Sequence, residues 1–227
     1  MTQQEYEHDW EDPRLAVEGF VTDYIVWRLA RDNLEWYEAP DIPENAEIEH
    51  QAMRDMCVVF ESRNSNDLIV LSDDLKSDSL TYARFCEVVE EFGKSATDIP
   101  SEMTYGRMVG LITFAGLICV DKARNNERRD IGLVALYTSK FIESRIKLTW
   151  VDSMRSWSLF LDMHRQVVAR LSSSRAPSRP SVPSAPSSSS SRRHSLLPSR
   201  RSSLILAAVS IVGVGAIVAG RALMKGH

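Results

Sequence analysis

The stretch Met108–Val120 restricts the fold more than any other part of the chain, because it leaves no polar face for water. Of its thirteen residues only Thr113 is plainly polar. A helix that is apolar all round lies inside protein or inside lipid, and thirteen residues rise only about 20 Å, which is short for a membrane span. We therefore expect a central helix buried in a protein core. Arg107, a permanent cation, directly precedes it. This arginine either lies at the mouth of a binding cleft or is a helix-end side chain that reaches solvent.

The rest of residues 13–171 shows helical spacing of apolar residues and no useful alternation of the β type. A first helix is expected after Asp12-Pro13, a capping side chain followed by a proline suited to a first turn. Further helices are expected from about Glu44 to Glu61, from a cap at Ser79 to Gly93, from near Glu102, over 133–150 and over 157–171. The inward faces of the first two are predicted to be Val17, Phe20, Val21, Tyr24 and Trp27, and Ile48, Ala52, Met56, Val59 and Phe60. The fold class predicted is all-α, with seven or eight helices.

Charge divides the chain into an acidic head and a basic tail. The net charge is -4, yet the residues from Ser172 onward contain eight Lys or Arg and no Asp or Glu, so residues 1–171 carry -12. An acidic head is not expected to bind nucleic acid. The acidic, polar residues 1–12 are expected to form a flexible N-terminus without a secretory signal.

The tail is expected to be a linker and a membrane anchor. Residues 172–203 contain fifteen serines, five prolines and six arginines, a composition typical of a disordered spacer. Leu204–Gly220 is apolar apart from Ser210, with basic residues on both sides, and the span extends to residue 224 with some snorkelling. We expect residues 204–224 to be a transmembrane tail anchor with the head facing the cytosol. Its modest hydrophobicity favours the mitochondrial outer membrane. The endoplasmic reticulum and the nuclear envelope are the alternative locations.

The sequence contains no recognisable catalytic or metal-binding pattern. The five histidines are scattered, and no nucleotide loop or nucleophile elbow occurs. His164 is expected to be a partly buried surface residue. The three cysteines, Cys57, Cys86 and Cys119, lack metal spacing and are expected to be buried in helices. We therefore predict no enzyme, no metal and no cofactor.

Several short motifs, taken in order, resemble the Bcl-2 (B-cell lymphoma-2) family of apoptosis regulators. Tyr105-Gly106-Arg107 followed by Phe114-Ala115-Gly116 is similar to the first homology motif of that family. Trp150 and, seven residues on, Trp157 within Arg155-Ser156-Trp157 resemble the second motif, and Glu18–Tyr24 with Glu35-Trp36 resembles the fourth. The run of motifs is similar to a nematode member of the family, over about residues 17–170.

The resemblance implies a helical bundle around a central hydrophobic hairpin, residues 103–120 and 131–150, and a surface groove that receives an amphipathic helix from a partner. Gly106 would let the partner backbone approach, and Arg107 would pair with an acidic residue of the partner helix. The groove residues so implied are Tyr105, Gly106, Arg107, Met108, Leu111, Phe114, Trp157 and Phe160.

The third motif departs from the family pattern in an informative way. Where the family has a Gly-Asp pair, this chain has Cys57 and Val58. Without the aspartate this helix would be a poor ligand for another member's arginine, so the resemblance implies a survival factor. It further implies that the chain sequesters an apoptosome adaptor ATPase, which activates caspases, at the mitochondrial outer membrane until a pro-apoptotic death-motif helix displaces it. Two alternatives are a pro-apoptotic pore former with the same fold and a tail-anchored scaffold unrelated to cell death.

Overall fold

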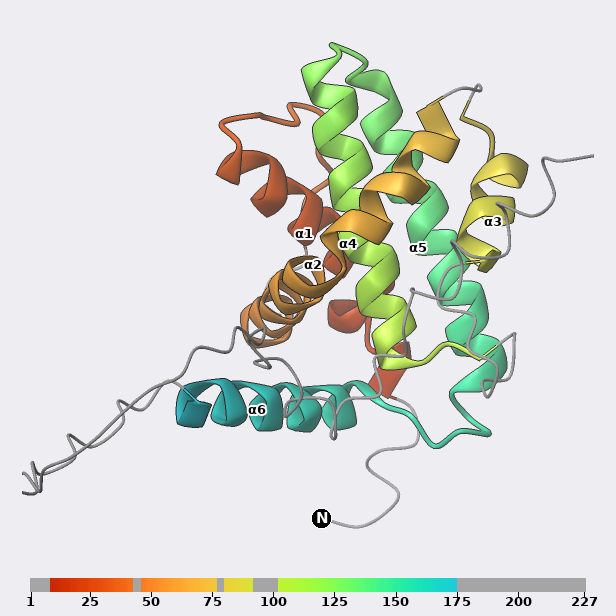
Figure 1. The fold of residues 1–227 in the computed structure, drawn as a ribbon. Helices are drawn as coiled ribbons and strands as arrows, with labels where there is room; N and C mark the ends of the chain where they lie inside the picture. Colours follow the sequence, from red (N-terminus) through yellow and green to blue (C-terminus); the bar gives the residue numbers. More distant parts are fainter. Residues whose placement is uncertain (1–8, 43–45, 77–79, 92–101, 175–227) are drawn as a thin grey trace, which may run out of the picture.

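A computed structural model describes residues 9–42, 46–76, 80–91 and 102–174 of the chain. In this part of the chain the structure has six α-helices and two short 3-10 helices, and it has no strand (Figure 1). The α-helices are α1 (Val17–Arg31), α2 (Glu47–Lys76), α3 (Tyr82–Glu91), α4 (Tyr105–Arg124), α5 (Arg129–Thr149) and α6 (Trp157–Ser174), and the 3-10 helices are η2 (Asp9–Glu11) and η3 (Pro13–Leu15). The all-α prediction is confirmed.

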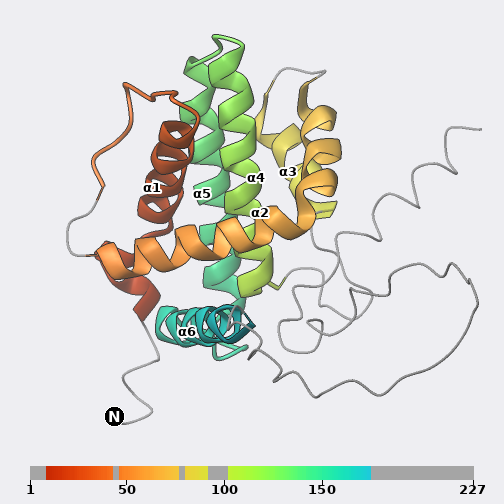
Figure 2. The ribbon, with the colours of Figure 1, turned by 60° about the vertical axis from the view of Figure 1, so that its left-hand side comes forward.

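Helix α4 is the centre of the bundle, as its sequence predicts. Every residue from Arg107 to Gly116 is buried, and α4 packs against α1, α2 and α5. Figure 2 shows α2 crossing in front of α4 and α5, with α6 below them. The apolar side chains that encircle α4 therefore face protein on all sides. Helices α4 and α5 form the expected hairpin, joined by a short charged turn.

Helix α2 bends at Asn64, just past Glu61, where the second helix was expected to end. Asn64 has non-helical backbone angles, φ -125° and ψ 18°, and α2 is two helical segments joined there. The Asn64 side chain donates a hydrogen bond to the Phe60 carbonyl at 2.8 Å, which competes with the regular backbone ladder. Counting the two segments separately gives seven helices.

The inward face of α2 differs at its start from the predicted one. Ala52, Met56 and Phe60 are buried as expected, but Ile48 is 73% exposed. The buried face at this end passes through His50 and Met53, which are 3% and 1% exposed. A polar histidine at an inward position concealed the true face from an argument based on apolar spacing.

Helix starts are shifted by local capping. Residues 13–15 form η3, in which the Asp12 carboxylate accepts from the Arg14 N–H at 2.9 Å, so α1 begins only at Val17. The hydroxyl of Thr81 accepts from the Arg84 N–H at 3.3 Å near the start of α3, and the expected cap, Ser79, lies outside the described residues. Helix α6 continues to Ser174, three residues past the end expected from the sequence.

The first described residues cap the last helix. Both carboxylate oxygens of Asp9 accept backbone N–H groups at the start of α6, from Trp157 at 3.0 Å and Ser158 at 2.9 Å. A carboxylate suits the exposed N–H groups and the positive end of a helix dipole. The N-terminal segment is thus fastened to α6.

No helix within the described residues is both long and apolar enough to cross a membrane. The expected anchor at 204–224, and the linker from residue 175 onward, lie outside the described residues.

Candidate partner-binding site

The start of α4 is positioned by a cap and by a tyrosine. The Thr104 hydroxyl accepts from the Arg107 N–H at 3.2 Å and so begins the helix. The Tyr105 hydroxyl donates to the Ser156 carbonyl at 2.7 Å and accepts from the Ser156 N–H at 3.0 Å. Burial of this ring raises the pKa of Tyr105 to about 12. Tyr105 therefore stays neutral and fastens α4 to the segment that leads into α6.

Two further contacts join the start of α4 to the segment after α5. The indole N–H of Trp150 donates to the Met103 carbonyl at 2.8 Å. The guanidinium of Arg155 bonds to the Glu102 carboxylate and lies 5.4 Å from the centre of the Tyr105 ring. The residues of the first and second motifs are therefore brought together, 45 or more positions apart in the sequence.

Arg107 is almost buried, with 8% of its surface exposed. Its guanidinium points toward α3 and α5, where it lies 3.5 Å from the Glu90 carbonyl and 5.9 Å from the centre of the Phe141 ring. A second guanidinium, that of Arg145, lies 5.4 Å from the same ring and pairs with the Glu90 carboxylate at 2.8 Å. The Arg107 guanidinium also donates to the Glu102 carbonyl at 3.4 Å, so Arg107 lies at the α3–α5 edge near the Arg145–Glu90 ion pair.

The other predicted groove residues divide into three groups. Tyr105 and Gly106 are partly exposed at the start of α4. Met108, Leu111 and Phe114 are at most 1% exposed and belong to the core. The remaining two, Trp157 and Phe160, are equally buried, and Trp157 stacks on Phe20 of α1 with ring centres 4.2 Å apart.

This distribution means that the buried apolar residues do not form the open floor of a groove in this structure. Their role as groove residues stays a prediction. The two outer positions, Tyr105 and Gly106, and the α3–α5 edge around Arg107 are the parts that a partner would reach first.

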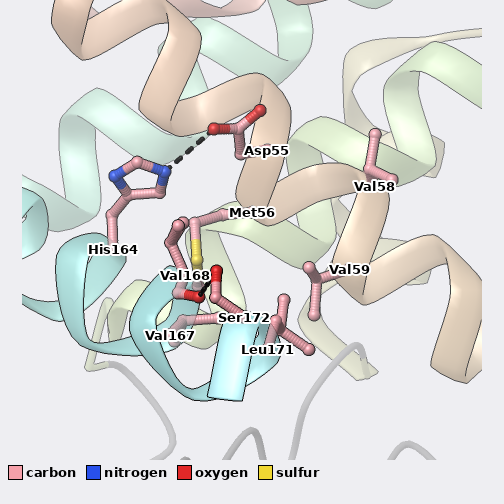
Figure 3. A pocket seen from close by; sticks show the side chains of 9 residues that line it. All are labelled: Asp55, Met56, Val58, Val59, His164, Val167, Val168, Leu171 and Ser172. Atoms are coloured by element: carbon pink, nitrogen blue, oxygen red, sulfur yellow. Dashed lines mark hydrogen bonds and ion pairs between the residues drawn. The ribbon is translucent and has the colours of Figure 1, made fainter. Parts of the chain in front are cut away.

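A hollow lies between α2 and α6 that the sequence did not reveal (Figure 3). It measures about 270 Å³, and the residues that line it are Asp55, Met56, Val58, Val59, His164, Val167, Val168, Leu171 and Ser172. At its polar end His164 Nε2 lies 3.0 Å from the Asp55 carboxylate, across the two helices. The apolar spacing along α6 was visible in the sequence. The sequence did not show that α6 faces α2, because that arrangement depends on the turn after α5.

The α1–α2 seam, by contrast, is built from charged side chains. Arg54 forms two hydrogen bonds with the Asp23 carboxylate, at 2.8 and 2.9 Å, and Arg28 bonds to Glu61 at 3.1 Å. His50 lies beside Asp23, with 3.9 Å between Nδ1 and a carboxylate oxygen. Burial lowers the pKa of His50, and Asp23 opposes this in part. Asp23, from the fourth-motif resemblance, therefore holds α2 in place.

The described residues contain no cluster of three or more His, Cys, Asp or Glu side chains that could hold a metal ion. His164 is partly buried as expected, with 18% of its side chain exposed. Cys57 and Cys119 are buried, and Cys86 is partly so.

Comparison with known proteins gives consistent results. Residues 53–157 match the family described as apoptosis regulator proteins, Bcl-2 family. The apoptosis regulator ced-9 of Caenorhabditis briggsae is 35% identical over 162 residues, which are 70% of this chain and 60% of that protein. The solved structure of Caenorhabditis elegans CED-9 is 31% identical, with a TM-score of 0.68 over 75% of this chain and all of that chain. A crystal structure of a CED-9/EGL-1 complex matches at 32% identity and a TM-score of 0.65, over 72% of this chain and 99% of that one.

Proposed function

Because the chain belongs to the Bcl-2 family of apoptosis regulators, we propose that it is an anti-apoptotic regulator that binds the amphipathic death-motif helix of a pro-apoptotic partner. The observation that carries the proposal is Arg107, which lies in the first turn of the central helix and faces the α3–α5 edge. A cation in that place suits a carboxylate carried by an incoming helix, by two parallel charge-assisted bonds. The similarity to a chain solved as a CED-9/EGL-1 complex supports the same role.

The third motif supports a protein that binds the helix of a partner over one that offers its own helix to another family member. Cys57 is fully buried, and its thiol lies 3.7 Å from the Val109 carbonyl of α4. Burial raises the pKa of this thiol, so it stays neutral. The next residue, where the family carries aspartate, is Val58, which is 38% exposed. Helix α2 thus offers no carboxylate at that position to another member's arginine.

We further propose that the chain sequesters a caspase-activating adaptor ATPase at the mitochondrial outer membrane, held there by residues 204–224. This step rests on the sequence resemblance and on the composition of the tail.

Access to Arg107 requires movement. A side chain that is 8% exposed cannot form two bonds with a partner carboxylate until the α3–α5 edge opens. The Arg145–Glu90 ion pair spans that edge and has to give way, together with the contacts of Tyr82 and Phe85 with Tyr137. Binding would therefore be coupled to displacement of α3 from α5.

The test is a titration of the full chain, in detergent micelles, with a synthetic amphipathic death-motif helix. Arg107→Ala should weaken binding about a hundredfold, because it leaves the partner carboxylate half-buried without its cation, and Gly106→Glu should abolish it by collision and charge repulsion. Arg14→Ala is the control, since that arginine is exposed and bonds to Asp12. Circular dichroism shows whether each variant is folded. No affinity in the unaltered chain would favour the scaffold alternative.

The charged residues at the tip of the α4–α5 hairpin argue against the pore-forming alternative. Lys122 pairs with both Glu127 and Asp130 there, and Arg124 pairs with Asp32 of the loop after α1. Moving this tip into lipid would carry all of these charges with it. Leakage of liposomes caused by the full chain would reverse this preference.

A further inference from the structure

The corner between α5 and α6 exposes three large apolar side chains. Leu148, Val151 and Met154 are 68%, 57% and 82% exposed. They occur within seven residues, where the chain leaves α5 and turns toward α6. Figure 1 shows this turn at the lower edge of the molecule. We call residues 148–156 the α5–α6 corner.

Met154 breaks two local rules at once. Its backbone lies in the left-handed region, with φ 50°. The Arg155 N–H bonds to the Trp150 carbonyl at 3.0 Å, and the Met154 N–H bonds to the Val151 carbonyl at 3.2 Å. This pair of bonds ends a helix in the Schellman manner, with Met154 at the position where glycine is preferred. A long apolar residue is thus kept in a strained backbone and in water, with no packing gain, which is the mark of a functional position.

The inner side of the corner is firmly held. Trp150 is fully buried and Ser156 is 1% exposed. These residues bond to Met103 and Tyr105 at the start of α4. The backbone that carries Leu148, Val151 and Met154 is therefore fixed to the start of α4.

We propose that the α5–α6 corner is a lipid contact, which places Leu148, Val151 and Met154 at the hydrocarbon edge of an anionic bilayer. Exposed apolar side chains flanked by a cation are suited to insertion into a membrane interface. Lys147, 65% exposed and paired with Glu143 at 2.7 Å one turn back along α5, is that cation. Met154 supplies a flexible chain that adapts to irregular surroundings.

The charge and length of the remaining chain favour lipid as the occupant. Asp152 in the corner is exposed, so the corner alone is not strongly basic. Eight Lys or Arg and no acidic residue occur from Ser172 onward, and each basic residue near an anionic surface adds attraction. Only 29 residues separate the end of α6 from the apolar run at 204–220. The inference rests on the proposed membrane attachment, which would keep the corner at a high effective concentration near the bilayer.

The test uses the full chain reconstituted into vesicles of mixed phosphatidylcholine and phosphatidylserine. Cys86→Ser removes the one cysteine that is not fully buried among the described residues. An environment-sensitive fluorophore is then attached at Met154→Cys or, as a matched control, at Tyr37→Cys in the exposed loop after α1, where the side chain is 73% exposed. The label at 154 should shift to the blue and be quenched by nitroxide lipids, and the label at 37 should do neither. A label at 154 that remains as exposed to water as the label at 37 would overturn the proposal.

A second variant separates a lipid contact from a structural role of the methionine. Met154→Gly relieves the left-handed strain, so the thermal midpoint in detergent should rise. In the same variant a fluorophore at Val151→Cys should lose most of its quenching by nitroxide lipids. A lower midpoint, or undiminished quenching, would contradict the proposal.

The proposed lipid contact and the proposed groove can be rejected independently of each other. Replacing Leu148 and Val151 together by aspartate should abolish the quenching of the label at 154 and leave the affinity for a death-motif helix unchanged within about twofold. If helix binding is absent in the unaltered chain while the label at 154 is quenched, the groove fails and the corner stands.

Discussion

The ring of Tyr24 lies directly over Gly116, so closely that a Cβ on the glycine would be 2.6 Å from the ring atom Cε1. Tyr24 comes from α1 and Gly116 from the buried helix α4, and both residues belong to the motifs that revealed the family. This contact explains the small residue in the first motif, because α1 can pack on α4 only where no side chain intervenes.

Gly116→Ala should therefore destabilise the chain by about 1–3 kcal/mol, because the added methyl group forces the buried Tyr24 ring out of place. Urea unfolding followed by circular dichroism would measure the loss. Gly132→Ala in α5 is the matched control, since its Cβ would meet only the Trp36 ring, at 3.9 Å. The control should be neutral or slightly stabilising. Equal effects of the two changes would contradict the assigned contact.

Tyr105→Phe should cost about 1–3 kcal/mol of the free energy of unfolding. The change removes the hydroxyl that bonds to both backbone groups of Ser156, a residue only 1% exposed, and it leaves those groups without that partner. Tyr37→Phe, at an exposed tyrosine, should change nothing measurable. A harmless Tyr105→Phe would show that the two hydrogen bonds contribute little.

Stability should fall on acidification because of His50. Its pKa in the folded chain is lowered by burial, so below a pH of about 6.5 the unfolded chain binds more protons than the folded one. The stabilisation is complete above that pH and is lost as the pH falls toward the lowered pKa. Urea midpoints at a pH of about 5 and about 8 should differ less in His50→Gln than in the unaltered chain. The same difference in both chains would exclude His50 as the cause.

Association with a partner helix should be slow, and Glu90→Gln should speed it. If the α3–α5 edge must open to expose Arg107, loss of the Arg145–Glu90 ion pair raises the population of the open form. An ion pair at such an exposed position contributes up to about 1 kcal/mol, so the association rate should rise by up to about fivefold. Stopped-flow fluorescence measures this rate.

Glu143→Gln is the control for that experiment. It removes a carboxylate of similar exposure, 51% against 50% for Glu90, which pairs with Lys147 within α5, and it should leave the association rate unchanged. If Glu90→Gln also left it unchanged, opening of this edge would not limit binding.

The fold was predictable because its strongest signals are local. The apolar run Met108–Val120 became the buried centre of α4, and α2 bends at Asn64, close to the helix end expected at Glu61. The exception was Ile48, which is exposed because His50 occupies the inward position.

The candidate site was less predictable, because burial depends on contacts between distant elements. Arg107 was expected at an open rim, or reaching solvent. Its position between α3 and α5 depends on contacts with Glu90 and Phe141, which lie on other helices. The hollow between α2 and α6 depends on the direction in which the corner sends α6. The exposure of Met154 likewise follows from a left-handed backbone that no spacing of apolar residues predicts.

The carboxylate of Asp9 has a consequence for the whole chain, because its partners lie 148 and 149 positions away. It links the first described residues to the start of the last described helix. Deleting the residues up to and including Asp9 would leave every motif intact, and it would still remove the cap at the start of α6. Proteolytic removal of the first residues would therefore weaken α6, the helix that precedes the tail in the sequence.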